Sequence, residues 1–191
     1  GERRRSPLLE AAYLARRLAE AGLKGLVFAG ARKSAELIAR YAAHPLVRPY
    51  RAGYTARERR RLEADLKEGR VRVLVSTSAL ELGVDIGELD AVVLVGYPGS
   101  TAAFWQRAGR AGRGERRALL VYIPREDPMD EYFLHRPALL LESPPEEAVA
   151  DPQNPVLCPL HLHAAAREKP LLAEELLCPE ARATLKERNG R

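Results

Sequence analysis

Short apolar segments alternate with amphipathic ones along the first two thirds of the chain, and this alternation constrains the fold more than any other feature. The run at 26–29 is apolar throughout, which is typical of a strand covered on both faces. Similar runs predict strands at 47–50, 71–75, 91–95 and 118–123. Helical patterns lie between them, and strands joined by helices form right-handed βαβ units. We therefore predict an α/β fold with three layers and a mostly parallel sheet.

Specific residues mark where the helices begin and end. Pro7 suits the first position of a helix that Gly22 can close. Thr55 and Glu58 have the spacing of a capping box, and the helix that they open should stop at Gly69. The sequence therefore predicts helices with defined ends on both sides of the second strand.

The pattern changes after residue 123. Asp127 and Pro128 can cap one more helix, but prolines then interrupt the chain repeatedly, as in a linker. The last thirty residues hold apolar positions for two or three short helices, too few to bury a core alone. We predict a domain at 1–125, and a linker with a helical extension at 126–191 that leads towards an accessory, winged-helix-like domain.

Charge is divided unevenly between these parts. The 191 residues carry a formal net charge of +5, but residues 1–125 hold 24 basic and 13 acidic side chains. A basic, Arg-rich domain favours a polyanionic partner, although heat adaptation or genome bias gives the same composition. No apolar run approaches the ~20 residues of a membrane span. Two cysteines are too few for a disulfide scaffold. We expect a protein of the reducing cytoplasm with no membrane partner.

Glycines and arginines share the helix expected over 101–111 and the residues after it. On a helix, Gln106, Arg110 and Arg113 would lie on one face, at positions i, i+4 and i+7. Two glycines between them would each cost ~1 kcal/mol relative to Ala, so a function should offset that cost. We predict a pair of guanidiniums directed across a cleft at a phosphate. A frayed basic helix end in solvent is the alternative.

Three hydroxyl side chains follow the third strand. Ser76, Thr77 and Ser78 stand where the next short helix should begin, and a helix start with free N–H groups favours an anion. Gly83 permits a tight turn, and Asp85 is a plausible acceptor for a ribose hydroxyl. The alternative is that these residues only cap the helix and stabilise the turn.

These segments resemble motifs of a known protein family. Residues 77–87 resemble motif V, and residues 106–113 resemble motif VI, of superfamily 2 DEAD/DEAH-type helicases. Phe28 with Arg32 and Lys33 resembles motif IV, and a nucleic-acid-contacting segment matches 50–54. The resemblance implies a RecA-like domain, the second of the two in such helicases.

Three further stretches resemble one subgroup, the YprA- or MrfA-like DNA-repair helicases. They are L-E-L-G-V-D-I-G at 80–87, the turn at 96–100 and the stretch at 151–155. This narrower match extends the resemblance to nearly the whole chain.

The resemblance also implies roles for individual residues. Arg110 and Arg113, with Gln106 beside them, would be arginine fingers that reach the γ-phosphate of ATP bound on a partner RecA-like domain. Gly83 and Asp85 would face the ribose of that nucleotide, whereas the neighbouring Arg107 would point elsewhere. Contacts to a tracked strand would come from a third set of residues: Arg32, Lys33, Arg51, Gly53, Ser76 and Thr77.

Two catalytic motifs of the family are missing from the sequence. It contains no G-x-x-x-x-G-K-[ST] phosphate loop and no D-E-x-H. ATP with Mg²⁺ would therefore be bound mainly by a missing N-terminal RecA-like domain of the same polypeptide. The isolated chain should not hydrolyse ATP. We predict the C-terminal motor domain of an ATP-dependent DNA helicase, with duplex and RNA substrates left open. A non-catalytic nucleic-acid-binding module is the alternative.

Four side chains near the C-terminus have the chemistry of zinc ligands: Cys158, His161, His163 and Cys178. The two histidines are two positions apart, so on a helix they would point to different faces. We expect packing roles here and no metal site.

Overall fold

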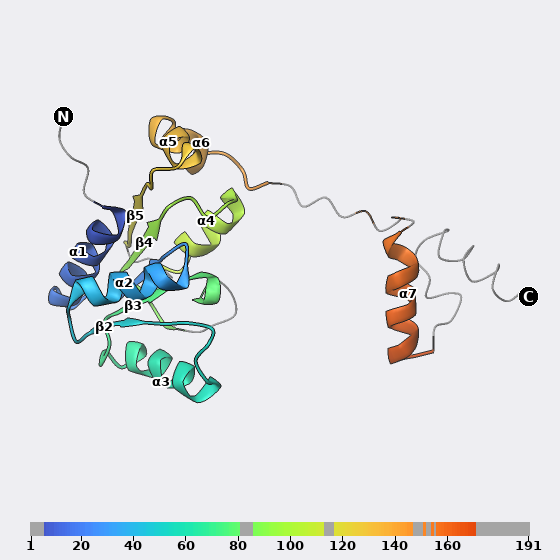
Figure 1. Ribbon diagram of the computed structural model, residues 1–191, viewed down its shortest axis with the longest axis horizontal. Helices are drawn as coiled ribbons and strands as arrows, with labels where there is room; N and C mark the ends of the chain where they lie inside the picture. The colour runs from blue at the N-terminus through green and yellow to red at the C-terminus, as the bar shows by residue number, and fades with distance from the viewer. Residues whose placement is uncertain are drawn as a thin grey trace, which may run out of the picture. The chain divides into compact units, whose positions relative to one another are not determined.

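The computed structural model describes residues 6–80, 86–112, 117–146, 151, 154 and 156–170. The chain divides into two compact units, Gly1–Glu146 and Glu147–Arg191. The first unit holds a sheet with its helices, and the second holds helix α7 (Figure 1). No helix in the described part of the chain combines the length and apolar character that a membrane span requires.

Five strands form one all-parallel sheet in the order β2-β3-β1-β4-β5. All five lie within the predicted runs or shifted by no more than two residues. Their bounds are β1 (Gly25–Phe28), β2 (Val47–Pro49), β3 (Val73–Ser76), β4 (Ala91–Val95) and β5 (Leu119–Ile123). Because β1 lies between β3 and β4, the carboxyl ends of these three strands are neighbours at one edge of the sheet.

The helices of the first unit include four that begin at the expected signals, at Pro7, Ala56, Thr101 and Pro128, and one, at Pro137, that was not predicted. In chain order, the helices are α1 (Pro7–Glu20), α2 (Arg32–Ala42), α3 (Ala56–Lys67), the 3₁₀ turn η1 (Ser78–Leu80), α4 (Thr101–Ala108), α5 (Pro128–His135) and α6 (Pro137–Leu141). The capping box of α3 is confirmed, because the Glu58 N–H donates to Thr55 Oγ1 and the Thr55 N–H donates to Glu58 Oε2. Gly69 ends that helix with a φ of +80°.

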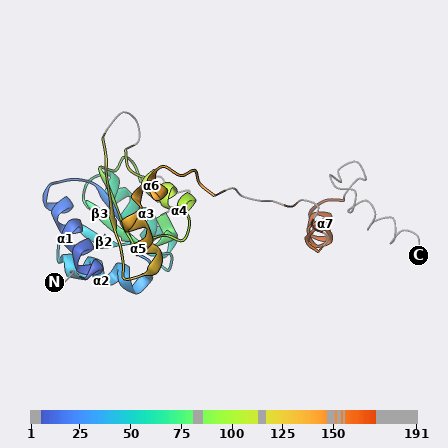
Figure 2. The same cartoon turned by 90° about the horizontal axis from the view of Figure 1, so that it is seen from above.

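The sheet is covered on both faces, as its uninterrupted apolar strands predict. On one face, Val27 of β1 packs in a core with buried residues of α1 and α2. On the other face, Leu26 and Phe28 pack with Leu66 of α3 and Phe104 of α4. Figure 2 shows α1 and α2 together on one side of the unit and α4 and α6 on the other. The three-layer α/β prediction is therefore confirmed.

Helices α5 and α6 pack on the second of these cores. Asp127 caps α5 by accepting a hydrogen bond from the Met129 N–H at 3.0 Å, so the predicted helix is confirmed. Phe133 and Leu140 are both buried in the core that also contains Phe104. These contacts place α5 and α6 in the first unit, whereas the division of the chain after residue 125 stays a prediction.

The second unit is described for α7 (Leu157–Glu168) and a few residues beside it. Within this part, Val156, Leu157 and Leu160 are exposed. The remaining short helices expected near the C-terminus lie outside the described residues.

Candidate nucleic-acid interface

A pocket of about 180 Å³ opens where the carboxyl ends of β1, β3 and β4 meet. Its walls come from the segments that follow these strands, from α4 and from the residues after β5. The lining residues are Ala29, Gly30, Thr77, Ser78, Val95, Gly96, Tyr97, Pro98, Arg107 and Arg125. Two guanidiniums and the hydroxyls of Thr77, Ser78 and Tyr97 therefore line the pocket, and none of the described lining residues carries a carboxylate. The arrangement suits an anion.

Arg125 is held in this pocket by a buried carboxylate. Its Nε donates to Asp130 Oδ2 at 3.2 Å, and the Asp130 side chain is 0% exposed whereas that of Arg125 is 44% exposed. Glycines lie beneath the guanidinium: a Cβ added to Gly96 would lie 2.0 Å from Arg125 Nε, and one added to Gly30 would lie 3.2 Å from Nη1. The Arg125 side chain can therefore take this position because Gly96 lacks a side chain, whereas a Cβ at Gly30 would require only a small shift of the guanidinium.

Asp130 also fixes the surrounding backbone and a tyrosine. Its Oδ1 accepts hydrogen bonds from the Tyr97 N–H at 2.6 Å and from the Tyr122 hydroxyl. Burial, together with the hydrogen bond to Asp130, raises the pKa of Tyr122 above its ordinary value of 10. The Asp130 carboxylate thus links the turn after β4, the end of β5 and the Arg125 side chain through hydrogen bonds.

The hydroxyl residues after β3 are placed unequally. Thr77 is half-buried and Ser78 exposed, and both line the pocket. Ser76 is 0% exposed, and its Oγ has no hydrogen-bond partner among the described residues. The hydroxyl of Ser76 is shielded from solvent, and its predicted contact with a strand stays a prediction.

The short helix expected after these hydroxyls is a three-residue 3₁₀ turn, Ser78–Leu80, within the described residues. Because residues 81–85, into which that helix would continue, lie outside the described residues, the anion site expected at a helix start stays a prediction. The described groups that favour an anion here are the side chains that line the pocket. Gly83 and Asp85 lie outside the described residues, and their predicted ribose contacts stay predictions.

Helix α4 ends earlier than the sequence suggested, which corrects the predicted face of Gln106, Arg110 and Arg113. The helix stops at Ala108, with Gly109 as its C-cap. The chain then pairs with the segment before β4, because the Gly112 N–H donates to the Leu89 carbonyl at 3.2 Å. Arg110 therefore follows the helix rather than extending its face.

The polar residues at this end of α4 have different environments. Gln106 is exposed on the last turn, whereas Arg110 is only 9% exposed and takes part in interactions within the domain. Arg107 lies over the Phe28 ring, with Cζ 5.3 Å from the ring centroid, and lines the pocket. Arg113 lies outside the described residues, so the predicted pair of arginine fingers stays a prediction.

The remaining predicted strand contacts lie beside two other segments. Arg32 and Lys33 begin α2 directly after β1 and are both exposed. Arg51 forms an ion pair with Glu36 of α2, and its Cζ lies 4.7 Å from the Tyr54 ring centroid. The pair helps to hold the segment after β2 against α2.

Gly53 differs from most glycines of the first unit. A Cβ placed on it would meet nothing within 4 Å, and its φ lies outside the left-handed range. No close contact in the described part of the domain therefore requires a glycine at position 53.

The N-terminus of α4 is capped twice. The Ser100 side chain accepts from the Ala103 N–H at 3.0 Å. The Glu146 carboxylate accepts from the N–H groups of Thr101, at 2.6 Å, and Ala102, at 2.9 Å. These backbone donors lower the pKa of Glu146 from 4.5 to about 2. Glu146 thereby joins the end of the first unit to the helix that carries Arg107.

Sequence reasoning missed Arg125 and Asp130, and it did not assign Arg107 to the pocket. Arg125 follows β5 by two positions, so it stands at the edge of the sheet where the carboxyl ends of all the strands meet. That rule for parallel sheets is the signal that could have identified it.

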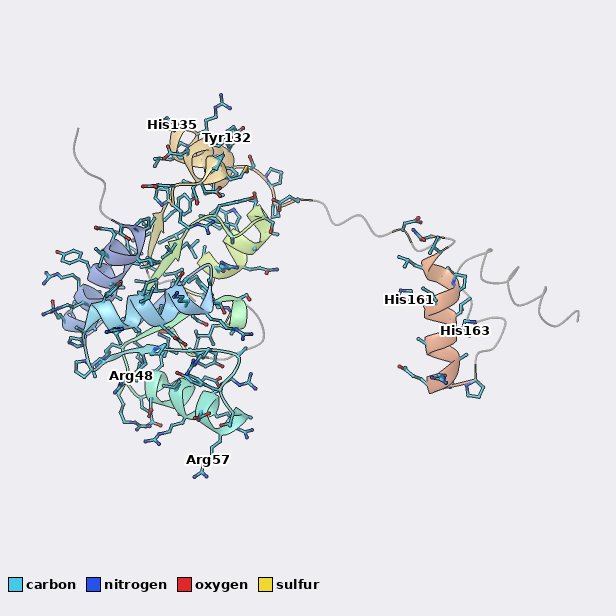
Figure 3. All side chains as sticks on the ribbon, in the orientation of Figure 1. Arg48, Arg57, Tyr132, His135, His161 and His163 are labelled. Atoms are coloured by element: carbon cyan, nitrogen blue, oxygen red, sulfur yellow. The ribbon has the colours of Figure 1, made fainter. Side chains whose placement is uncertain are left out.

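The candidate zinc ligands form no metal site among the described residues. Figure 3 shows His161 and His163 on different sides of α7. Cys178 lies outside the described residues. Figure 3 also shows Arg57 projecting from α3 away from the sheet.

Known proteins share both the sequence and the fold of this chain. The ATP-dependent helicase YprA of Bacillus subtilis (strain 168) is 39% identical over 180 residues, which cover 90% of this chain and 24% of YprA. The ATP-dependent helicase hrq1 of Schizosaccharomyces pombe is 37% identical over 179 residues, which cover 88% of this chain and 17% of hrq1. The chain therefore spans about a quarter or less of these relatives.

A crystal structure of the DUF1998 helicase MrfA, bound to DNA and AMPPNP, matches this fold with a TM-score of 0.83 at 36% identity. The match covers 99% of this chain and 28% of that one. The family described as helicase conserved C-terminal domain matches residues 8–115. This chain therefore belongs to the helicase conserved C-terminal domain family, as the second RecA-like domain of a superfamily 2 helicase.

Proposed function

We propose that this chain is the second motor domain of an ATP-dependent DNA helicase, in which it holds the tracked strand and supplies arginine fingers to ATP. The observation that carries the proposal is the pocket at the carboxyl ends of β1, β3 and β4, whose described lining residues include two guanidiniums and three hydroxyls and no carboxylate. Parallel α/β sheets bind ligands at this edge. MrfA bound to DNA, at 36% identity, supports DNA as the polyanion.

Strand binding is the first part of this role. Arg32 and Lys33 follow β1, and Thr77 follows the neighbouring strand β3, so these residues would contact the sugar-phosphate backbone of one strand. Gly53 and Arg51, after β2, would extend the contact along the strand. Because these contacts are to phosphates, binding should weaken steeply with salt and depend little on base sequence.

ATP turnover is the second part of the role. Arg110 and Arg113 would stabilise the charge of the transferred γ-phosphate, while the nucleotide and Mg²⁺ are held mainly by an N-terminal RecA-like domain of the same polypeptide. Arg110 is 9% exposed, so only a small part of its side chain is accessible unless its present contacts rearrange. Without that partner domain the chain should not hydrolyse ATP.

The test is ATPase activity of the polypeptide that joins this domain to its N-terminal RecA-like partner. Arg110→Ala should lower DNA-stimulated turnover by about 10³-fold or more, as expected for an arginine finger, and leave strand affinity near that of the parent. Arg40→Ala, which removes the same charge from the last turn of α2, is the matched control and should retain turnover. Unchanged turnover in Arg110→Ala with intact strand binding would favour the non-catalytic nucleic-acid-binding module instead.

The biological setting is part of the same proposal. It extends the proposal to DNA repair in the cytoplasm, as the motif resemblance to the YprA- or MrfA-like DNA-repair helicases implies. Cells that carry Arg110→Ala in the full polypeptide should then become more sensitive to a DNA-damaging agent. Wild-type survival of such cells over the full dose range would contradict the repair role.

A further inference from the structure

Arg125 brings to the pocket a guanidinium that the helicase motifs do not account for. Its Nε is used by Asp130, at 3.2 Å, and within the described residues its two Nη groups make no hydrogen bond. The side chain is 44% exposed and lines the pocket. Arg125 is therefore anchored at one side of its guanidinium and open at the other.

Asp130, which anchors Arg125, is not among the described residues that line the pocket. It is fully buried behind Arg125. Its oxygens already accept from the Tyr97 N–H and the Tyr122 hydroxyl as well as from Arg125. An anion in the pocket would therefore meet the Nη donors of Arg125. The Asp130 carboxylate that orients Arg125 already accepts three hydrogen bonds.

The space in front of Arg125 has the size and chemistry for one phosphate group. Its volume of about 180 Å³ leaves room for a phosphate group. Thr77 and Ser78 offer hydroxyl donors, and Arg107 adds a second positive charge. A planar guanidinium with two free Nη groups matches the oxygens of a phosphate in a bidentate manner.

We propose that this pocket is a phosphate subsite of the strand-binding face, in which Arg125 binds the non-bridging oxygens of one backbone phosphate of a single strand. Asp130 is a positioning residue that sets the orientation of Arg125. The inference rests on the proposed function, because it takes the ligand to be the tracked nucleic-acid strand. It adds one contact, from the segment after β5, to those expected from the motif residues.

The first experiment measures binding of a fluorescent single-stranded oligonucleotide to the 191-residue chain over a range of salt concentrations. Arg125→Ala should lower affinity at least about tenfold, the loss expected for a charge-assisted hydrogen bond. It should also reduce the slope of log K against log salt by about 0.7, the value for one phosphate of a single strand. Arg40→Ala, at the end of α2 and outside the pocket lining, should change neither quantity.

The second experiment places one uncharged methylphosphonate linkage at successive positions of the oligonucleotide. With the wild-type chain, one position should show the loss of affinity that Arg125→Ala causes with the natural strand. In the Arg125→Ala chain, the same linkage should cost nothing further at that position. A purely structural role for Arg125 would give no such position-specific coupling.

Two more variants keep the test informative if Arg125→Ala fails to fold. Arg125→Lys retains a cation near Asp130 but lacks the planar, two-pronged guanidinium. It should still lower the affinity for the oligonucleotide at least about threefold at constant salt. Asp130→Asn keeps an acceptor for the Tyr97 N–H and removes the charge that orients Arg125. Its effect on affinity should vanish in the Arg125→Lys background, whereas a general structural or electrostatic effect would persist there.

The outcomes separate this inference from the proposed function. If the wild-type chain binds the oligonucleotide and all Arg125 variants bind equally well, the subsite is wrong and the strand-binding role stands. If the wild-type chain binds no single strand at all, both are wrong. If millimolar inorganic phosphate shifts the Arg125 Nε–Hε NMR signal while a saturating oligonucleotide does not, the pocket takes free phosphate, and the assignment to the strand is overturned.

Discussion

Replacing Gly96 with alanine should disturb Arg125 without removing any charge. Gly96 has a φ of +84°, and its added Cβ would lie 2.0 Å from Arg125 Nε and 2.6 Å from Cζ. Gly99, in the same turn between β4 and α4, has a φ of +101° and nothing within 4 Å of an added Cβ. Gly96→Ala and Gly99→Ala therefore share the backbone strain, and only the first displaces Arg125.

The magnitude follows from two contributions. A left-handed conformation costs alanine about 1–2 kcal/mol, partly offset by the lower entropy of the unfolded chain, so each variant should lose about 1 kcal/mol. Ordinary van der Waals contact needs about 3.5 Å, so the guanidinium must move by roughly 1.5 Å in Gly96→Ala. The Nε to Asp130 hydrogen bond is already 3.2 Å long and would break. Because Arg125 is 44% exposed, solvent screening limits this further loss to about 1 kcal/mol.

The assay is thermal and urea unfolding of the two variants and the parent chain, followed by circular dichroism. Gly96→Ala should lose about 2 kcal/mol and Gly99→Ala about 1 kcal/mol, with about 2–4 °C in Tm for each kcal/mol. Single-strand affinity should fall in Gly96→Ala alone. Equal stability losses and equal affinities in the two variants would refute the role of Gly96 as the platform for Arg125.

Three further predictions test other parts of the domain. Thr55→Ala should lower the free energy of unfolding by about 1 kcal/mol, measured in urea, because it removes the capping box of α3; Ser6→Ala, whose side chain makes no cap hydrogen bond, is the control and should be neutral. Gly53→Ala should leave the unfolding free energy unchanged, since nothing lies within 4 Å of the added Cβ, but should weaken oligonucleotide binding if a phosphate backbone passes close by; unchanged affinity would remove Gly53 from the strand-binding face. Glu146, whose pKa is lowered from 4.5 to about 2, stabilises the fold above pH 4.5 and loses this contribution as the pH falls through 2; the Tm difference between the parent and Glu146→Gln should therefore shrink from pH 5 to pH 2, and a constant difference would contradict the capping role.

The strands and helix starts were predictable because their signals are local. The uninterrupted apolar run of β1 and the spacing of Thr55 and Glu58 each determine structure within a few residues. The end of α4 was not predictable in the same way. Gly109 caps the helix and residue 111 pairs with Leu89, a contact formed only when the chain folds back beside β4. The predicted face with Arg110 failed because this tertiary contact outweighed the helical spacing.

The pocket was only partly predictable, for a reason of topology. Thr77 belongs to a motif and could be singled out from neighbouring residues. Arg125, Gly96 and Gly30 lie far apart in the sequence and meet because β1 pairs with β4 and β4 with β5. Asp130, in a segment that looked like the start of a linker, completes the arrangement. No periodicity within a short window can show that such residues converge.

The two outer strands of the sheet differ in how well they resist recruiting a strand from another molecule. β2 has three residues, carries the exposed Arg48 and ends in Pro49, which has no N–H to donate. β5 has five residues without charge or proline, and Leu119 is 52% exposed. Self-association on heating should therefore begin at β5, and Leu119→Lys should raise the temperature at which light scattering appears, whereas no change would place the vulnerable edge elsewhere.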